Sequence, residues 1–201
     1  MSHRRHVVTR DGCGGIEFEA VNEGYSHGMS MAGILNRVRT NYARGEPRPL
    51  GGYLRAMGGY LGLVGAATVV GVARGARLPE RFSWSDTLLV SVATHKMTRL
   101  LNKSAVTSPL RAPFTRFEGS AGEGEVLESV PSTGNHRHAV GELLTCPFCS
   151  GVWLATSLTA GLVLAPRPTR LLTTTMAAVA GSDFLHLAYD AAKSAAAQAG
   201  E

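Results

Sequence analysis

Four stretches of the chain are long and mostly apolar, and each of them predicts a helix. The clearest one covers 57–73, where seventeen residues carry no charged side chain. A helix rises about 1.5 Å per residue, so this one nearly crosses the ~30 Å hydrocarbon core of a bilayer. The other three stretches cover 84–101, 148–165 and 171–189. The pattern therefore predicts an all-α fold, an integral membrane four-helix bundle.

Glycine is common in the chain, with 24 residues, and several of these glycines lie inside the apolar stretches. A soluble helix loses about 1 kcal/mol for each glycine that replaces alanine, whereas membrane helices use glycine to approach one another closely. Gly58, Gly62 and Ala66 recur at every fourth position of the first stretch. They predict a stripe of small residues on which another helix packs.

The segments outside these stretches are polar. Residues 1–52 have no sustained hydrophobic period except an amphipathic pattern at 29–43, and they predict a partly disordered cytoplasmic arm. Residues 104–142 predict a long polar loop that is flexible over the glycine-rich segment 119–125. The predicted organisation is a polar arm (1–52), a membrane helical domain (53–190) and a polar tail (191–201).

Two of the four apolar stretches carry charged or titratable side chains within the helical pattern. His95, Lys96 and Arg99 interrupt the second stretch, and Asp183 and His186 interrupt the fourth. Charged groups are costly inside a bilayer, so they mark either a functional face or the end at which a helix leaves the membrane. Both interpretations fit this pattern.

The distribution of basic residues predicts the topology. The chain has 20 Lys and Arg against 15 Asp and Glu, and these basic residues are most frequent before the first apolar stretch and in the loop 104–142. Cytoplasmic segments of membrane proteins carry the excess of Lys and Arg. We therefore expect a multi-pass protein of the cell membrane with the long loop and both termini in the cytoplasm.

The same charges bear on the partners. A basic arm beside a bilayer predicts contact with anionic lipid headgroups. We expect no nucleic-acid partner, because the strand-and-aromatic platforms of RNA-binding modules are absent from the sequence.

This topology places the interrupting side chains at a similar depth. The second stretch ends on the cytoplasmic side, the third begins there, and the fourth returns there. Residues four apart on a helix, such as His95 and Arg99, share one face. We therefore expect a polar site at the cytoplasmic mouth of the bundle. Its candidate members are His95, Arg99, Cys146, Cys149, Asp183 and His186.

Cys146 and Cys149 open the third apolar stretch as a C-x-x-C pair. Thr145 or Cys146 can cap a helix there, and Pro147 suits its first turn. The unpaired N–H groups of a helix N-terminus stabilise a thiolate. One interpretation is therefore a membrane thiol–disulfide oxidoreductase in which the two cysteines react and His95, Arg99 and Asp183 assist.

A second interpretation is a zinc-binding membrane protein. A C-x-x-C pair supplies two of the four ligands of a zinc site. His136 and His138 lie upstream in the same loop and would supply the other two. Zinc is the one cofactor that the sequence predicts.

A third interpretation has no chemistry in it. The cysteines pack as small apolar residues where helices cross, and Asp183 pairs with Arg99 as a buried structural ion pair. The protein is then a structural or partner-binding membrane component, with another protein or a second copy as its partner. We favour this interpretation. The oxidoreductase and zinc interpretations stay open beside it, so the sequence alone does not decide whether the protein is an enzyme.

Four motifs in this order resemble the family called domain of unknown function 1360, which includes proteins labelled as sporulation proteins. They are HKMTRL at 95–100, VTSPLRAPF at 106–114, ELLTCPFCSGVW at 142–153 and AGSDFL at 180–185. The resemblance covers about residues 84–190 and implies a small integral membrane protein without an assigned reaction. The matching positions are His95, Lys96, Arg99, Arg111, Pro113, Glu142, Cys146, Cys149, Trp153 and Asp183.

Overall fold

The computed structural model describes residues 5–10, 16–21, 31–43, 48–132 and 134–199. The chain divides into two units, Met1–Glu46 and Pro47–Glu201, and each is described by itself. In the first unit, strands β1 (Arg5–Arg10) and β2 (Ile16–Val21) form an antiparallel pair, and α1 covers Met31–Ala43. The helix predicted at 29–43 is confirmed, whereas the sequence analysis missed the two strands.

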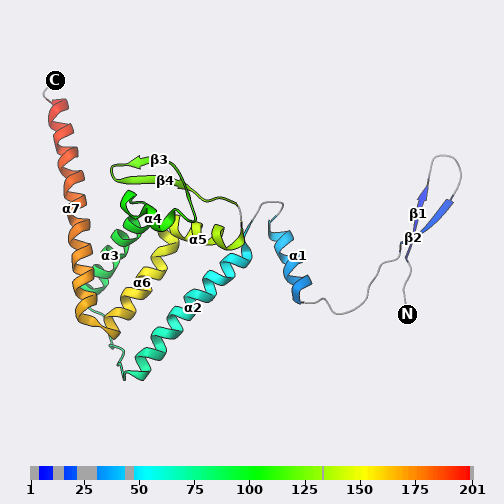
Figure 1. The fold of residues 1–201 in the computed structure, drawn as a ribbon, viewed down its shortest axis with the longest axis horizontal. Helices are drawn as coiled ribbons and strands as arrows, with labels where there is room; N and C mark the ends of the chain where they lie inside the picture. Colours follow the sequence, from blue (N-terminus) through cyan, green and yellow to red (C-terminus); the bar gives the residue numbers. More distant parts are fainter. Residues whose placement is uncertain (1–4, 11–15, 22–30, 44–47, 133, 200–201) are drawn as a thin grey trace. The chain divides into compact units, whose positions relative to one another are not determined.

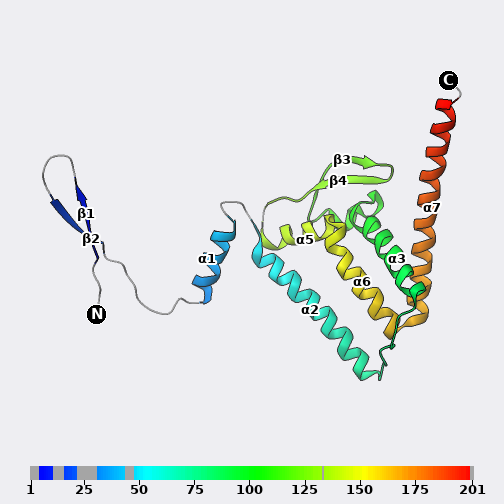
Figure 2. The same ribbon diagram turned by 180° about the vertical axis from the view of Figure 1, so that it is seen from behind.

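The second unit is mostly helical (Figure 1). Its long helices are α2 (Leu50–Ala73), α3 (Trp84–Asn102), α6 (Pro147–Leu164) and α7 (Pro166–Ala199). A helix therefore occupies each of the four predicted ranges. Helices α3, α6 and α7 pack on one another, while α2 packs on α5 (Asn135–Thr145) and on α6. Helix α2 stays beside α6 as far as its C-terminal end (Figures 1 and 2), since a Cβ atom added at Gly59 or Gly71 would meet Trp153 at 3.4 Å or Leu164 at 3.6 Å.

Local chemistry sets where α3 begins. The Ser83 hydroxyl accepts a hydrogen bond from the Asp86 backbone N–H at 3.0 Å, which satisfies one free donor of the first turn. The Asp86 carboxylate then binds the Arg170 guanidinium through two hydrogen bonds of 3.1 and 3.0 Å. This pair fastens the beginning of α3 to the first turns of α7.

Two helices, α2 and α6, are long and apolar enough to cross a membrane, with mean hydropathies of 1.6 and 1.5. Almost none of their apolar window is buried within the chain, at 0% for α2 and 11% for α6. Large apolar side chains such as Leu61, Val69 and Val72 are exposed on α2. Helices α3 and α7 do not meet the same hydropathy criterion.

The connection 104–142 is folded, so the prediction of a long loop that is flexible over 119–125 is wrong, and its two strands add a small sheet to a mostly helical chain. It contains η1 (Ala105–Thr107), α4 (Ser108–Arg111), β3 (Arg116–Gly122), β4 (Glu125–Ser129) and α5. Strands β3 and β4 pair antiparallel, and positive φ angles at Gly122 and Gly124 form the turn. Most of β3 is exposed, so its sequence has no apolar alternation to reveal a strand. We call residues 103–145 the cap.

The predicted stripe of small residues on α2 is also wrong for packing within the chain. A Cβ atom added at Gly58 or Gly62 would have nothing within 4 Å, whereas one at Gly59 would meet Trp153 at 3.4 Å. The Trp153 ring packs edge-on against Tyr60, with ring centroids 5.5 Å apart. The face of α2 that packs on α6 is therefore the one with Gly59 and Tyr60, because both lie against the Trp153 ring.

Candidate functional site

Arg111 lies fully buried at the centre of the cap. Its Nε and Nη2 donate to the two carboxylate oxygens of Glu128, at 2.6 and 3.2 Å. The other acceptors are the carbonyls of Leu101 and Ser104 and the hydroxyls of Thr107 and Ser108. A buried charge is tolerated only when it is paired and its donors are satisfied, and Arg111 meets both conditions. It joins the end of α3, η1, α4 and β4 into one piece.

A second buried polar contact lies next to the cysteine pair. The Ser150 hydroxyl donates to Asn102 Oδ1 at 3.0 Å, and Asn102 Nδ2 donates to the Leu143 carbonyl at 3.3 Å. Asn102 and Ser150 are only 1% and 4% exposed. They connect the end of α3, the end of α5 and the beginning of α6. The sequence analysis missed both residues, because one polar residue at the end of an apolar run is indistinguishable from an exposed one.

Cys146 and Cys149 form a disulfide at the N-terminus of α6. Cys146 is the N-cap residue, and its sulfur accepts the Cys149 backbone N–H at 3.2 Å, as the predicted capping role requires. Pro147 is the first residue of the helix, also as predicted. Cys149 is exposed, Cys146 is half-buried, and Phe148 between them is 91% exposed.

The predicted ion pair between Asp183 and Arg99 is wrong. Asp183 on α7 pairs with Lys96 on α3, and Arg99 binds both carboxylate oxygens of Glu125 at 2.6 Å. Lys96 and Arg99 lie three residues apart on α3, so the sequence places both near α7. Strand β4, which was not predicted, supplies the carboxylate that Arg99 takes instead.

The remaining candidates divide between these groups. The His95 ring stacks near Phe184, with centroids 6.4 Å apart, beside the Lys96–Asp183 pair. His186 is exposed on α7. Among the hydrogen bonds and ion pairs of the described residues, none joins the cysteine pair to His95, Arg99 or Asp183. The structure therefore holds the predicted site residues as separate contacts.

Glu142 on α5 is the centre of another cluster. Its carboxylate accepts the Tyr53 hydroxyl and lies 3.2 Å from His138 Nε2 and 4.0 Å from Arg48. Of these contacts, the hydrogen bond from the Tyr53 hydroxyl is the one that comes from α2. This contact fastens the beginning of α2 to the cap.

The structure does not assemble the predicted zinc site. His138 Nδ1 lies 3.0 Å from the Pro131 carbonyl, and His136 Nδ1 lies 2.7 Å from an Arg55 guanidinium nitrogen. Both histidines thus have other partners, and the two cysteines bind each other. In the described ranges, no three His, Cys, Asp or Glu side chains are grouped so that they could hold a metal ion.

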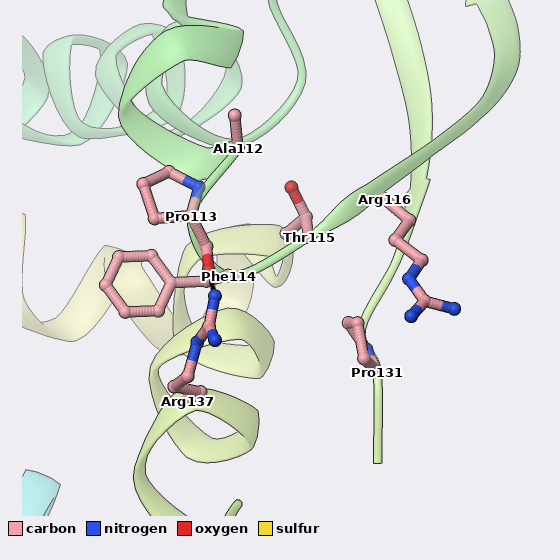
Figure 3. Close-up of a pocket in the computed structure, with 7 residues that line it drawn as sticks. All are labelled: Ala112, Pro113, Phe114, Thr115, Arg116, Pro131 and Arg137. Carbon is pink, nitrogen blue, oxygen red and sulfur yellow. Dashed lines mark hydrogen bonds between the residues drawn. The ribbon is translucent and has the colours of Figure 1, made fainter. Parts of the chain in front are cut away.

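A hollow in the cap is bordered by Pro131, whose carbonyl is the partner of His138 (Figure 3). Its lining residues are Ala112, Pro113, Phe114, Thr115, Arg116, Pro131 and Arg137. Arg137 donates from its guanidinium to the Pro113 carbonyl. Ala112, Pro113 and Phe114, the last three residues of the VTSPLRAPF motif, border this hollow.

Comparison with known proteins gives one curated relative and a family. The chain is 34% identical over 70 residues to "Sporulation protein YjcA" of Bacillus subtilis (strain 168), which is 34% of this chain and 59% of that protein. No solved structure matches the chain. The model of the family described as "Protein of unknown function (DUF1360)" matches residues 89–189, about half of the chain. The chain therefore belongs to the DUF1360 family.

Proposed function

We propose that this protein is a structural or partner-binding component of the cell membrane, in which four spans carry the cap on the cytoplasmic side. The observation that supports this proposal is that the polar side chains bind one another within the chain. Lys96, Arg99, Arg111 and Glu142 each bind another element of the same chain, and for Glu142 that element is α2, through Tyr53. Side chains that are engaged in this way hold helices together, and they are not presented to a substrate.

Exposed apolar surface supports the location in a membrane. Contiguous apolar patches on a protein surface mark contacts with a membrane or with another protein. The apolar windows of α2 and α6 are almost wholly exposed. Phe148 and Trp84 are each 91% exposed, at the beginning of α6 and of α3. A bilayer would cover all of this surface.

The charges of α3 and α7 are compatible with two further spans. Ionisable residues within a membrane segment face the bundle interior and pair with one another. Lys96 pairs with Asp183, and Asp86 pairs with Arg170, so each of these contacts joins α3 to α7. The pairing offsets the charge that lowers the hydropathy of both helices.

A cell-based comparison tests this function. The double variant Cys146→Ala/Cys149→Ala should fold, and it should rescue a strain that lacks the protein, because in this proposal the cysteines carry out no chemistry. Arg111→Met should lower the amount of folded protein and fail to rescue the strain. A cysteine-free chain that accumulates normally but fails to rescue the strain would contradict a purely structural role.

A thiol–disulfide oxidoreductase is the second candidate, because Cys146 and Cys149 are paired and Cys149 is exposed. A thiolate of a dithiol substrate would attack the Cys149 sulfur and displace the Cys146 thiolate. The second substrate thiolate would then attack the substrate sulfur of the mixed disulfide and release Cys149. The substrate is oxidised to a disulfide, and the cysteine pair gains two electrons. If the cysteine-free chain folds but does not rescue the strain that lacks the protein, that result would support this candidate.

Zinc binding is a weaker alternative, because the four predicted ligands have other partners among the described residues. Metal analysis of detergent-purified protein tests it directly. About one zinc per chain, lost in Cys149→Ser, would support the zinc site over the other two candidates.

A further inference from the structure

We infer that the hollow in the cap is a binding site for a phosphate-type oxyanion, held by the guanidinium groups of Arg116 and Arg137. The inference deepens the proposed function, because a cap beside a membrane would meet this chemistry in the phosphate of an anionic lipid headgroup. Free phosphate has the same chemistry, and the experiment below separates the two sources.

The lining of the hollow has a single sign of charge. Its seven residues include two arginines and neither aspartate nor glutamate. Arg137 comes from the first turn of α5 and Arg116 from the beginning of β3, so the two cations approach from different elements (Figure 3). Two guanidinium groups at one hollow repel each other unless an anion lies between them. A phosphate oxyanion suits them, since the planar fork of arginine matches phosphate geometry.

Four of the five carboxylates in the cap have partners of their own, and the fifth, Glu123 in the β3–β4 turn, does not line the hollow. Glu125 binds Arg99, and Glu128 binds Arg111. Glu142 binds Tyr53 and His138, and Glu118 accepts the Ser129 hydroxyl. Among the described residues, neither Arg116 nor Arg137 has an ion pair. Within the described ranges, no carboxylate therefore offsets the charge of the two arginines.

The hollow is held in a fixed shape before any ligand arrives. The hydrogen bond to the Pro113 carbonyl positions Arg137. The buried Arg111 lies two residues before Pro113, and the Thr115 hydroxyl bonds the Arg111 carbonyl at 3.0 Å. An arginine that is already positioned loses little conformational entropy when an anion binds, and this applies to Arg137.

Exposed apolar side chains on the cap elements that lead to the hollow favour a lipid as the source of the anion. Val106, Leu110 and Phe117 are 85%, 62% and 69% exposed, and they belong to η1, α4 and β3. Basic groups beside exposed apolar ones are typical of surfaces that lie on anionic membranes. A phosphate dissolved in water would gain nothing from these apolar neighbours.

Calorimetric titration of the full chain in dodecyl maltoside tests the site. Dioctanoyl-phosphatidylglycerol should bind, and Arg116→Gln/Arg137→Gln should weaken its affinity at least tenfold. Arg77→Gln/Arg167→Gln removes the same charge away from the hollow and should bind as the wild type does. Equal affinity of the two double variants would overturn the inference, and so would a wild type that binds no phosphate-bearing ligand.

Two further arms identify the source. Tighter binding of phosphatidylglycerol than of inorganic phosphate assigns the site to lipid, and equal affinity assigns it to free phosphate. If the double variant does not fold, the single change Arg116→Gln at an exposed position replaces it, with the same expected loss of affinity. A cap found outside the cell would overturn the proposed function but leave this binding in detergent unchanged, so the two failures are distinguishable.

Discussion

The Arg111 guanidinium and the Glu128 carboxylate form an ion pair that is closed to solvent, with Nε and Oε2 2.6 Å apart and the side chains 0% and 6% exposed. The Arg99–Glu125 pair has the same N–O distance of 2.6 Å, but its side chains are 46% and 26% exposed. Breaking a buried pair leaves an uncompensated charge, whereas an exposed pair is replaced by water. The two arginines therefore offer a matched comparison.

Arg111→Ala should lower the free energy of unfolding by roughly 3–5 kcal/mol, because Glu128 would remain buried without a partner. Arg99→Ala should lower it by about 1 kcal/mol or less, since its partner Glu125 is open to water. Denaturant unfolding in detergent, followed by circular dichroism, measures both. Equal losses in the two variants would show that the cap is not organised around Arg111.

The helices could be predicted from the sequence because the residues that form and end them lie next to one another in the chain. Apolar runs indicate where the helices lie, and Pro147 marks the first turn of α6, whereas α7 begins at Pro166, five residues before the predicted start at 171. The cap could not be predicted in this way. Arg111 binds backbone carbonyls and Glu128, which lies seventeen residues further along the chain. No local sequence pattern predicts such partners.

The candidate site was predicted only where its chemistry is local. Cys146 as the cap of α6 follows from the residues beside it. The partner of Asp183 depends on where α7 crosses α3, and helical periodicity alone does not distinguish Lys96 from Arg99 at that crossing. Polar residues at helix crossings therefore need the packing before they can be paired.

A double-mutant cycle tests the corrected pairing of Asp183. Lys96→Ala and Asp183→Ala should show a coupling energy of about 0.5–1 kcal/mol, because their charged groups are in contact. Arg99→Ala and Asp183→Ala should be additive, since Arg99 binds Glu125. Chemical unfolding of the three single and two double variants provides the measurement. Coupling of Asp183 to Arg99 instead of Lys96 would restore the pairing that was expected from the sequence.

Glycine substitutions on α2 test which face meets α6. Gly59→Leu should destabilise the protein by roughly 1–3 kcal/mol, because a Cβ atom at this position already lies 3.4 Å from Trp153 and leaves no space for a leucine side chain. Gly62→Leu should be tolerated, since the space beside it is open. Melting temperatures in the same detergent measure both changes. If Gly62→Leu were the more disruptive of the two, that face of α2 would contact another molecule, such as a second copy of the chain.

Counting thiols tests the cysteine pair. In a Cys13→Ser chain purified without reductant, a maleimide reagent should label no cysteine, and after reduction it should label two. Cys149→Ser on the same background should free one thiol, that of Cys146, without any reductant. Mass spectrometry of the intact chain counts the labels. Two reactive thiols before reduction would contradict the pairing seen in the structure and favour the packing or zinc interpretations.

The topology can be tested at the β3–β4 hairpin. A chain with Cys13→Ser, Cys146→Ala and Cys149→Ala carries no thiol, so a single cysteine introduced by Ser120→Cys reports on the cap alone. A membrane-impermeant maleimide should leave this cysteine unlabelled in intact cells and label it after lysis, because the basic cap is expected in the cytoplasm. Ala76→Cys, in the connection between α2 and α3, should be labelled in intact cells. The reverse pattern would place the cap, its disulfide and the Arg116–Arg137 hollow outside the cell, where an oxidised cysteine pair persists more readily.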